Sequence, residues 1–125
     1  MLSVETVGNQ PAHYQDAHLY VDYQRKAASL DLERMRLTRK EYELLAMLVR
    51  NAGDIVARED LLQDIWGYSN QIRTRTLDVH IRRLRRKLGP YAEAYIETIF
   101  GIGYRFQPHR THIAQRPMPA YAVGA

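Results

Sequence analysis

Residues 75–88 read RTLDVHIRRLRRKL, and this stretch decides the fold. Its large aliphatic side chains are spaced by four, three and four positions, and they are Leu77, Ile81, Leu84 and Leu88. This spacing places them on one narrow stripe of a helix. The opposite side of that helix carries Arg75, Val79, Arg82, Arg83 and Arg86. Gly89-Pro90 predicts where the helix ends, so we expect an amphipathic helix that packs through its aliphatic stripe and points arginines outward.

The basic residues of the chain are concentrated in this helix. The 125 residues contain 18 Lys and Arg and 14 Asp and Glu, which gives a modest net charge of +4. Seven basic residues lie between Arg73 and Lys87 with one acidic residue, Asp78, whereas the remainder has 11 basic and 13 acidic residues. A surface lattice of ion pairs would need interleaved acids. A focused positive patch is typical of a protein that binds an anionic partner.

The composition excludes several classes of protein. The absence of Cys excludes disulfide scaffolds, cysteine-ligated zinc, iron–sulfur clusters and thiol catalysis. No apolar run approaches the ~20 residues that span a bilayer, and no early apolar block resembles a signal peptide. We therefore expect a cytoplasmic protein with no membrane partner. The five histidines are scattered and the paired carboxylates sit on predicted helix surfaces, so we expect no metal, no cofactor and no enzymatic activity.

Two further helices are predicted before the basic one. Thr38 and Glu41 have the spacing of a capping box, so a helix begins there and buries Tyr42, Leu45, Leu48 and Val49. A second helix is predicted over residues 58–66 and ends at Gly67. Ala57 occupies its N-cap position and has no side-chain acceptor, so we expect an amide of the first turn to be unpaired or hydrated. Ile55-Val56 predicts a very short strand between these helices.

Short apolar runs predict strands on both sides of the helices. Residues 19–21, 26–30 and 34–37 suggest an antiparallel meander, and residues 95–99 and 104–106 flank a glycine-rich hairpin turn. The fold class predicted is α+β, a winged helix-turn-helix with an N-terminal antiparallel sheet, three helices and a C-terminal β-hairpin wing. We expect a leader or linker over 1–18, the domain over 19–107 and a disordered tail over 108–125.

The basic helix suits double-stranded DNA. A helix of about 14 residues is roughly 21 Å long, and the major groove admits one helix. The arginine fork pairs with guanine O6 and N7 or clamps phosphate, and Val79 is placed to touch a thymine methyl group. The alternatives are a basic face that is merely solvated, and a winged helix that serves as a protein-interaction module with little DNA specificity.

Residues 37–106 resemble the DNA-binding effector domain of OmpR/PhoB-family response regulators. The stretches that carry this resemblance are LTRKEYELLAML (37–48), VAREDLLQDIWG (56–67), RTLDVHIRRLRRKL (75–88) and IETIFGIGYRF (96–106). The resemblance implies a sequence-specific transcriptional regulator with the third helix (75–88) in the major groove and the wing (96–106) on the adjacent minor groove or backbone. It also implies direct-repeat DNA sites and a head-to-tail dimer on DNA.

The resemblance further assigns roles to individual residues. The expected base-reading residues are Asp78, Val79, Arg82, Arg83 and Arg86. The expected contacts to the DNA backbone are Trp66, Arg75, Thr76, His80, Arg85, Thr98 and Tyr104, of which Trp66 and Tyr104 are also candidates for the core. The wing tip is Phe100, Gly101, Ile102 and Gly103. A possible RNA polymerase contact, or a mere connector, is the loop Gly67, Tyr68, Ser69, Asn70, Gln71, Ile72, Arg73 and Thr74.

Three features depart from the family pattern. Phe100 stands where the wing usually carries a basic residue, and stacking on DNA, insertion into it and contact with a protein are all open for its side chain. Ala57 replaces the usual small polar cap. The 125 residues hold no receiver domain, so the chain is either a stand-alone effector or a fragment of a larger regulator.

The salt dependence of binding distinguishes DNA binding from a protein-interaction module. If about six phosphates are neutralised, the slope of log K for DNA binding against log salt concentration is near −5.

Overall fold

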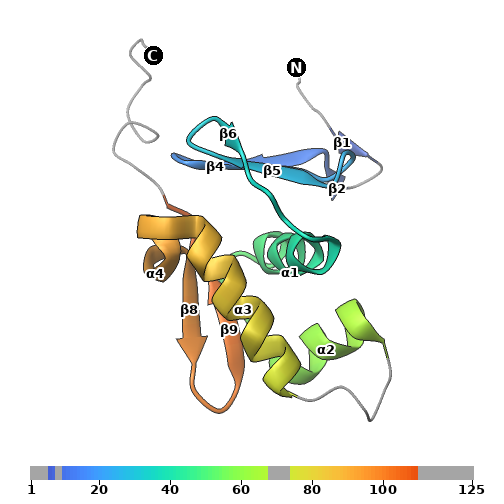
Figure 1. The fold of residues 1–125 in the computed structure, drawn as a ribbon. Helices are drawn as coiled ribbons and strands as arrows, with labels where there is room; N and C mark the ends of the chain where they lie inside the picture. The colour runs from blue at the N-terminus through green and yellow to red at the C-terminus, as the bar shows by residue number, and fades with distance from the viewer. Residues whose placement is uncertain (1–5, 8–9, 68–73, 110–125) are drawn as a thin grey trace.

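The computed structural model describes residues 6–7, 10–67 and 74–109, and the helices lie between the N-terminal strands and the C-terminal hairpin and beside that hairpin (Figure 1). The strands are β1 (Thr6–Val7), β2 (Gln10–Pro11), β3 (His13–Gln15), β4 (Leu19–Asp22), β5 (Ala27–Leu30), β6 (Glu33–Arg34), β7 (Ile55–Ala57), β8 (Ile96–Ile99) and β9 (Gly103–Phe106). The helices are α1 (Arg39–Arg50), α2 (Arg58–Trp66), α3 (Thr74–Leu88), the 3₁₀ turn η1 (Gly89–Tyr91) and α4 (Ala92–Tyr95). This α+β arrangement confirms the predicted fold class.

The N-terminal sheet is the predicted antiparallel meander, in the order β3-β4-β5-β6. Leu19, Val21 and Ala28 are buried, and the sheet covers α1 in Figure 1. Its first strand, His13–Gln15, pairs with β4 and lies inside the 1–18 segment expected to be a leader. No strand was expected there from the sequence, because three residues are too few to show an alternation of apolar and polar side chains. The last strand is Glu33–Arg34, earlier and shorter than the predicted 34–37.

The carboxylate of Asp16 explains why the early residues belong to the domain. It accepts hydrogen bonds from the hydroxyls of Tyr14 and Tyr95 and from the backbone amides of His18, Leu19 and His109. Burial alone would raise the pKa of Asp16, but these hydrogen bonds outweigh it and lower that pKa. The segment before β4 and the segment after β9 are thus both hydrogen-bonded to the Asp16 carboxylate. Of the expected disordered tail, residues 110–125 lie outside the described residues.

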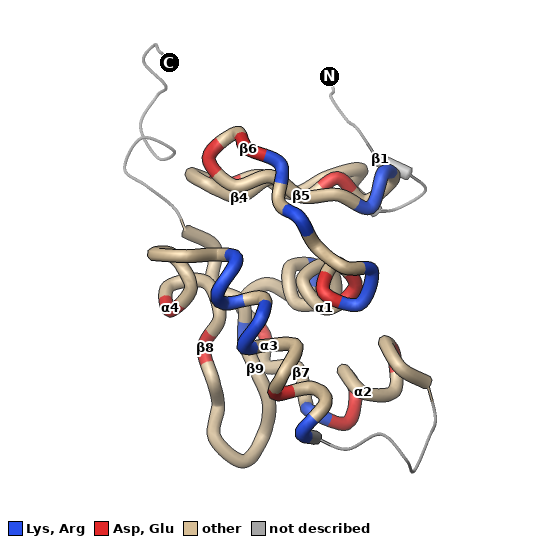
Figure 2. The backbone as a smooth tube through the Cα atoms, in the orientation of Figure 1, with Lys and Arg blue, Asp and Glu red and all other residues tan. Residues whose placement is uncertain are grey.

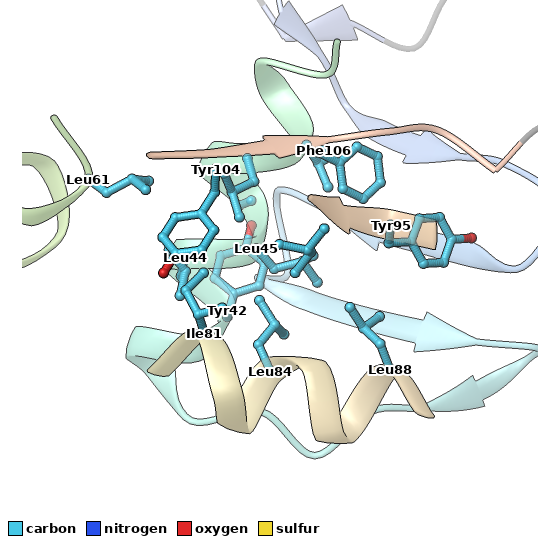
Figure 3. Packing of buried hydrophobic residues seen from close by; sticks show 14 of the residues in the cluster. Tyr42, Leu44, Leu45, Leu61, Ile81, Leu84, Leu88, Tyr95, Tyr104 and Phe106 are labelled. Carbon is cyan, nitrogen blue, oxygen red and sulfur yellow. The ribbon is translucent and has the colours of Figure 1, made fainter. Parts of the chain in front are cut away.

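Helix α1 begins as predicted and sits at the centre of the core. The Thr38 hydroxyl accepts from the Glu41 amide at 3.2 Å, and the Thr38 amide donates to the Glu41 carboxylate at 2.9 Å. Besides the four predicted residues, Leu44 and Ala46 are buried, because α1 is covered by more than one neighbour. It contacts α2, α3 and β9. Figure 3 shows Leu84 and Leu88 of α3 pointing toward Leu45.

The C-terminal hairpin joins β7 in a three-stranded sheet of order β7-β9-β8. The amide of Arg58, at the start of α2, donates to the carbonyl of Ile102 at 3.0 Å. As expected, the Ala57 side chain caps no amide of α2, but the wing backbone supplies an acceptor for the first amide of the helix, that of Arg58. Tyr95, expected in a strand, instead ends α4 and stacks on Phe106 with ring centroids 5.3 Å apart.

An ion pair between the buried Glu41 and the partly exposed Lys87 ties the start of α1 to the end of α3. Glu41 is 1% exposed, and the Lys87 ammonium lies 2.5 Å from its carboxylate. Lys87 also donates to the carbonyl of Arg36 at 2.6 Å. Burial alone would raise the pKa of Glu41, but hydrogen bonds from Lys87 and from the Thr38 amide lower it. The pair therefore supports the capping box from outside the helix.

We expect Lys87→Met to lower the free energy of unfolding near neutral pH by about 2 kcal/mol, because it leaves the buried Glu41 charge without its partner. Because the folded-state pKa of Glu41 is depressed, its contribution is present above the unfolded-state pKa and is lost as pH falls through the folded-state pKa. The difference between the variant and the parent should therefore shrink in acid. Urea unfolding followed by circular dichroism at several pH values measures it.

The control for this experiment is Arg86→Met, since Arg86 precedes Lys87 on the same helix and is exposed. We expect that variant to stay within about 0.5 kcal/mol of the parent. Equal losses in the two variants, or a Lys87 effect independent of pH, would contradict a stabilising role for the ion pair.

Candidate nucleic-acid interface

The aliphatic stripe of α3 is buried as predicted, and this fixes which side of the helix faces solvent. Leu77, Ile81, Leu84 and Leu88 are each at most 2% exposed. Four arginines of the helix are exposed, and they are Arg75, Arg82, Arg83 and Arg86. Figure 2 shows basic residues along much of α3. The helix therefore presents a row of guanidinium groups, while its opposite side is held by the core.

The exposed charge is smaller than the sequence suggests, because two cations of α3 are used within the domain. Lys87 pairs with Glu41. The Arg85 guanidinium donates to the Ile96 carbonyl and to the Thr98 hydroxyl, each at 2.8 Å. Arg85 and Thr98 were each expected to contact the DNA backbone, whereas the structure joins them to each other as a brace between α3 and β8.

A second brace joins α3 to β9 and α2 through Asp78. One carboxylate oxygen accepts from the Arg58 guanidinium at 2.5 Å and from the Tyr104 hydroxyl at 2.9 Å. Tyr104 is 4% exposed, which places it in the core. Burial and the hydrogen bond to Asp78 raise the pKa of Tyr104. Its hydroxyl, expected to contact the DNA backbone, is therefore directed to a neighbouring side chain.

Arg58 was not among the predicted site residues, although the sequence contains a weak signal for it. A cation in the first turn of a helix opposes the macrodipole, which suggests a partner elsewhere in the fold. That partner is Asp78, whose side chain remains 45% exposed. Arg75, Asp78, Val79 and Arg82 line a shallow depression on the outer side of α3. The structure thus brings together three of the expected base-reading residues and one expected phosphate contact.

Trp66 and His80 connect the end of α2 to α3. Their rings meet edge to face with centroids 4.9 Å apart, and both side chains are half-buried. The His80 ring nitrogen Nδ1 lies 2.8 Å from the carbonyl of Thr76. Lys40 adds a cation 5.9 Å from the Trp66 ring. Both the core interpretation and the phosphate-contact interpretation of Trp66 are compatible with this position.

The wing tip is apolar and exposed. Phe100 is 89% exposed and Ile102 is 51% exposed. Gly101 has a φ of +80°, the left-handed conformation that favours glycine at this turn. Gly103 is needed for another reason, because a Cβ atom there would lie 1.9 Å from the carbonyl oxygen of Val56.

The expected RNA polymerase loop falls mostly outside the described residues. Gly67 ends α2 with a φ of +85°, and its amide donates to the Gln63 carbonyl at 2.9 Å. Thr74 begins α3, and the six residues between them are not described. Over the described ranges, no helix combines the length and apolarity needed to cross a membrane. The same ranges contain no group of three or more His, Cys, Asp or Glu suited to hold a metal ion.

Comparison with known proteins identifies the fold and its relatives. The family model described as "Transcriptional regulatory protein, C terminal" matches residues 32–106. Response regulator ArlR of Staphylococcus saprophyticus is 38% identical over 87 residues, which are 69% of this chain and 40% of ArlR. The chain thus spans less than half the length of this relative.

Two solved structures extend the comparison. Response regulator DrrB of Thermotoga maritima, an OmpR/PhoB homologue, superposes with a TM-score of 0.73 at 32% identity, over 80% of this chain and 46% of DrrB. The DNA-binding domain of RstA from Klebsiella pneumoniae, solved in complex with the RstA box, superposes with a TM-score of 0.67 at 31% identity. That match covers 78% of this chain and 98% of the RstA domain.

We expect Arg85→Ala to lower the free energy of unfolding by about 1–2 kcal/mol, because it removes two hydrogen bonds between α3 and β8. Arg82→Ala is the matched control on the same helix, since its side chain is exposed, and it should change stability by less than about 0.5 kcal/mol. Thermal unfolding of both variants measures the difference. If Arg85→Ala is as stable as Arg82→Ala, the brace contributes nothing to the fold.

Proposed function

The chain belongs to the family of C-terminal domains of transcriptional regulatory proteins, the effector domains of OmpR/PhoB-type response regulators, and we propose that it binds double-stranded DNA and regulates transcription. The observation that carries this proposal is the row of exposed arginines on α3, whose opposite side is held by a fully buried aliphatic stripe. A rigid cationic helix of this length fits the major groove.

Two classes of contact follow from the positions of the side chains on α3. Val79, Arg82, Arg83 and Arg86 lie on the outer side of the helix and would approach base edges, with Asp78 beside them. Arginine reads guanine through O6 and N7, and valine contacts a thymine methyl group. Arg75, Thr76, His80 and Trp66 would contact phosphates. These phosphate contacts fix the register of the protein on the duplex and carry no sequence information of their own.

The residues of the two braces have a different role in this proposal. Arg85, Thr98 and Tyr104 are already hydrogen-bonded inside the domain, so we assign them to positioning the wing beside α3. With the wing held there, β8 and β9 would lie on the adjacent minor groove or on its backbone. A direct-repeat site, a head-to-tail dimer and a contact with RNA polymerase are further proposals, and they rest on the family resemblance.

A protein-interaction module is the second candidate, and the exposed Phe100 favours it. The four exposed arginines of α3 weigh against it, because charged residues are depleted at the centres of protein interfaces. Family membership also agrees with the expectation that the chain is not an enzyme. Selection of binding sites from random duplexes tests the proposal most directly, because recovery of no consensus sequence would contradict specific DNA recognition.

The salt dependence of binding should be shallower than the sequence alone suggests. Because Lys87 and Arg85 are paired within the domain, only the four exposed arginines of α3 remain to neutralise phosphates or read bases. We expect the slope of log K against log salt to be no steeper than about −3 to −4, the value for four neutralised phosphates, and shallower when some of these arginines read bases instead. Fluorescence anisotropy with a labelled duplex at several salt concentrations measures this slope, and a slope near zero would favour the protein-interaction module.

We expect Arg83→Ala to weaken binding to the selected site by about 1–3 kcal/mol and to relax the preference at one base pair. Arg75→Ala should weaken binding to all duplexes alike, because Arg75 is assigned to phosphate. Titration of both variants against the selected site and its single-base variants distinguishes the two roles. Equal losses on every duplex would remove the base-reading role of Arg83.

A further inference from the structure

Two exposed apolar side chains share the tip of the wing. The exposed large apolar residues of the described ranges are Leu32, Ile55, Phe100 and Ile102. Leu32 and Ile55 lie on other elements, whereas Phe100 and Ile102 flank Gly101 at one turn. Burying a phenylalanine ring away from water is strongly favourable in free energy, because the ring has a large apolar surface. A phenylalanine that is 89% exposed at a projecting turn is placed to become buried against a partner.

The backbone beneath these side chains is held on both sides. The Ile102 amide donates to the Ile99 carbonyl at 2.9 Å, which closes the turn. The Ile102 carbonyl accepts from the Arg58 amide at 3.0 Å, which ties the turn to the start of α2. The close approach of Gly103 to the Val56 carbonyl fixes β9 against β7. The backbone that carries Phe100 is thus held by its neighbours, so little conformational entropy of the turn would be lost when Phe100 binds a partner.

The braces described above fix this tip relative to α3. Asp78 of α3 bonds to Tyr104 on β9 and to Arg58, and Arg85 of α3 bonds to Thr98 on β8. In Figure 1 the hairpin turn projects past the helices, at the end of the molecule where α3 begins. When α3 occupies the major groove, the tip is therefore directed at the neighbouring part of the same duplex.

The chemistry of the tip excludes an electrostatic role there. No residue between Glu97 and Arg105 is charged, and Figure 2 shows an uncharged loop between β8 and β9. Such a tip cannot neutralise phosphate, and it cannot use the negative potential of a narrow minor groove as an arginine does. Apolar side chains act on DNA in another way, by entering the minor groove as a wedge that partly unstacks a base step and bends the duplex.

We propose that Phe100, supported by Ile102, is such a wedge: it enters the minor groove next to the α3 site, partly unstacks one base step and bends the DNA. The inference rests on the proposed DNA-binding function and extends it to the wing. Pyrimidine–purine steps such as TA are the easiest to unstack. The wing thereby selects a flexible step at a position where no base edge is read by hydrogen bonds.

The experiment compares the parent chain with Phe100→Ala on duplexes that carry the selected sequence flanked by either TA or AA steps. A 2-aminopurine base at the flanking step reports unstacking, and energy transfer between dyes at the duplex ends reports bending. We expect the parent to unstack the TA step, to bend the duplex by roughly 20–90°, and to favour TA over AA flanks by about fivefold. Phe100→Ala should lose all three effects and keep the salt dependence of the parent, because no charge is changed.

Leu32→Ala is the matched control, since Leu32 is 97% exposed and lies in the turn between β5 and β6. It should unstack, bend and discriminate as the parent does. If Phe100→Ala behaves like the parent in all three measurements, the wedge is wrong and a protein contact becomes the better account of Phe100. If the parent binds the duplex without unstacking or bending, the wedge is wrong and the DNA-binding proposal stands. If the parent binds no duplex at low salt, both proposals fail.

Discussion

The burial of the aliphatic stripe of α3 against the core is the constraint on which the rest of the structure depends. It buries Leu77, Ile81, Leu84 and Leu88 and thereby fixes the rotation of the helix about its own axis. Once that rotation is fixed, four arginines of the helix face solvent, namely Arg75, Arg82, Arg83 and Arg86. A slip of one residue would bury a guanidinium group without a partner, which is strongly unfavourable. Packing and the cationic surface are therefore two consequences of one pattern.

Several basic side chains of the domain form ion pairs or hydrogen bonds within the fold. Lys87 neutralises the buried Glu41 of the capping box, and Arg85 bonds to the β8 strand. Arg58, from another helix, pairs with the acidic residue of α3. These contacts join α1, α2, α3 and the hairpin into one unit. A duplex that meets this surface would find a preformed shape, so little conformational entropy remains to be lost on binding.

The base of the wing is hydrogen-bonded to the helices, whereas the tip of the wing is exposed to solvent. At the base, the Ile102 carbonyl accepts a hydrogen bond from the amide of Arg58 at the start of α2. Thr98 and Tyr104 of the two strands form hydrogen bonds with side chains of α3. At the tip, the exposed side chains are apolar and uncharged. A firmly held base with an apolar tip suits insertion into a partner, and it does not suit long-range electrostatic attraction, which α3 provides.

The sequence by itself determined the elements whose signals are local: the capping box of α1, the limits of α2, the buried stripe of α3 and the glycine turn of the wing. These signals depend on side-chain periodicity and on cap and turn residues within a few positions of one another. Only the tertiary structure decided that His13–Gln15 joins the sheet, that Tyr95 belongs to a helix, and that Arg85, Lys87 and Tyr104 turn inward. Each of these outcomes depends on a partner that is distant in the chain or on another element, such as Asp16 for Tyr95 and Glu41 for Lys87. A basic residue looks the same in sequence whether its charge meets solvent or a buried carboxylate, because the difference lies in what the fold places opposite it.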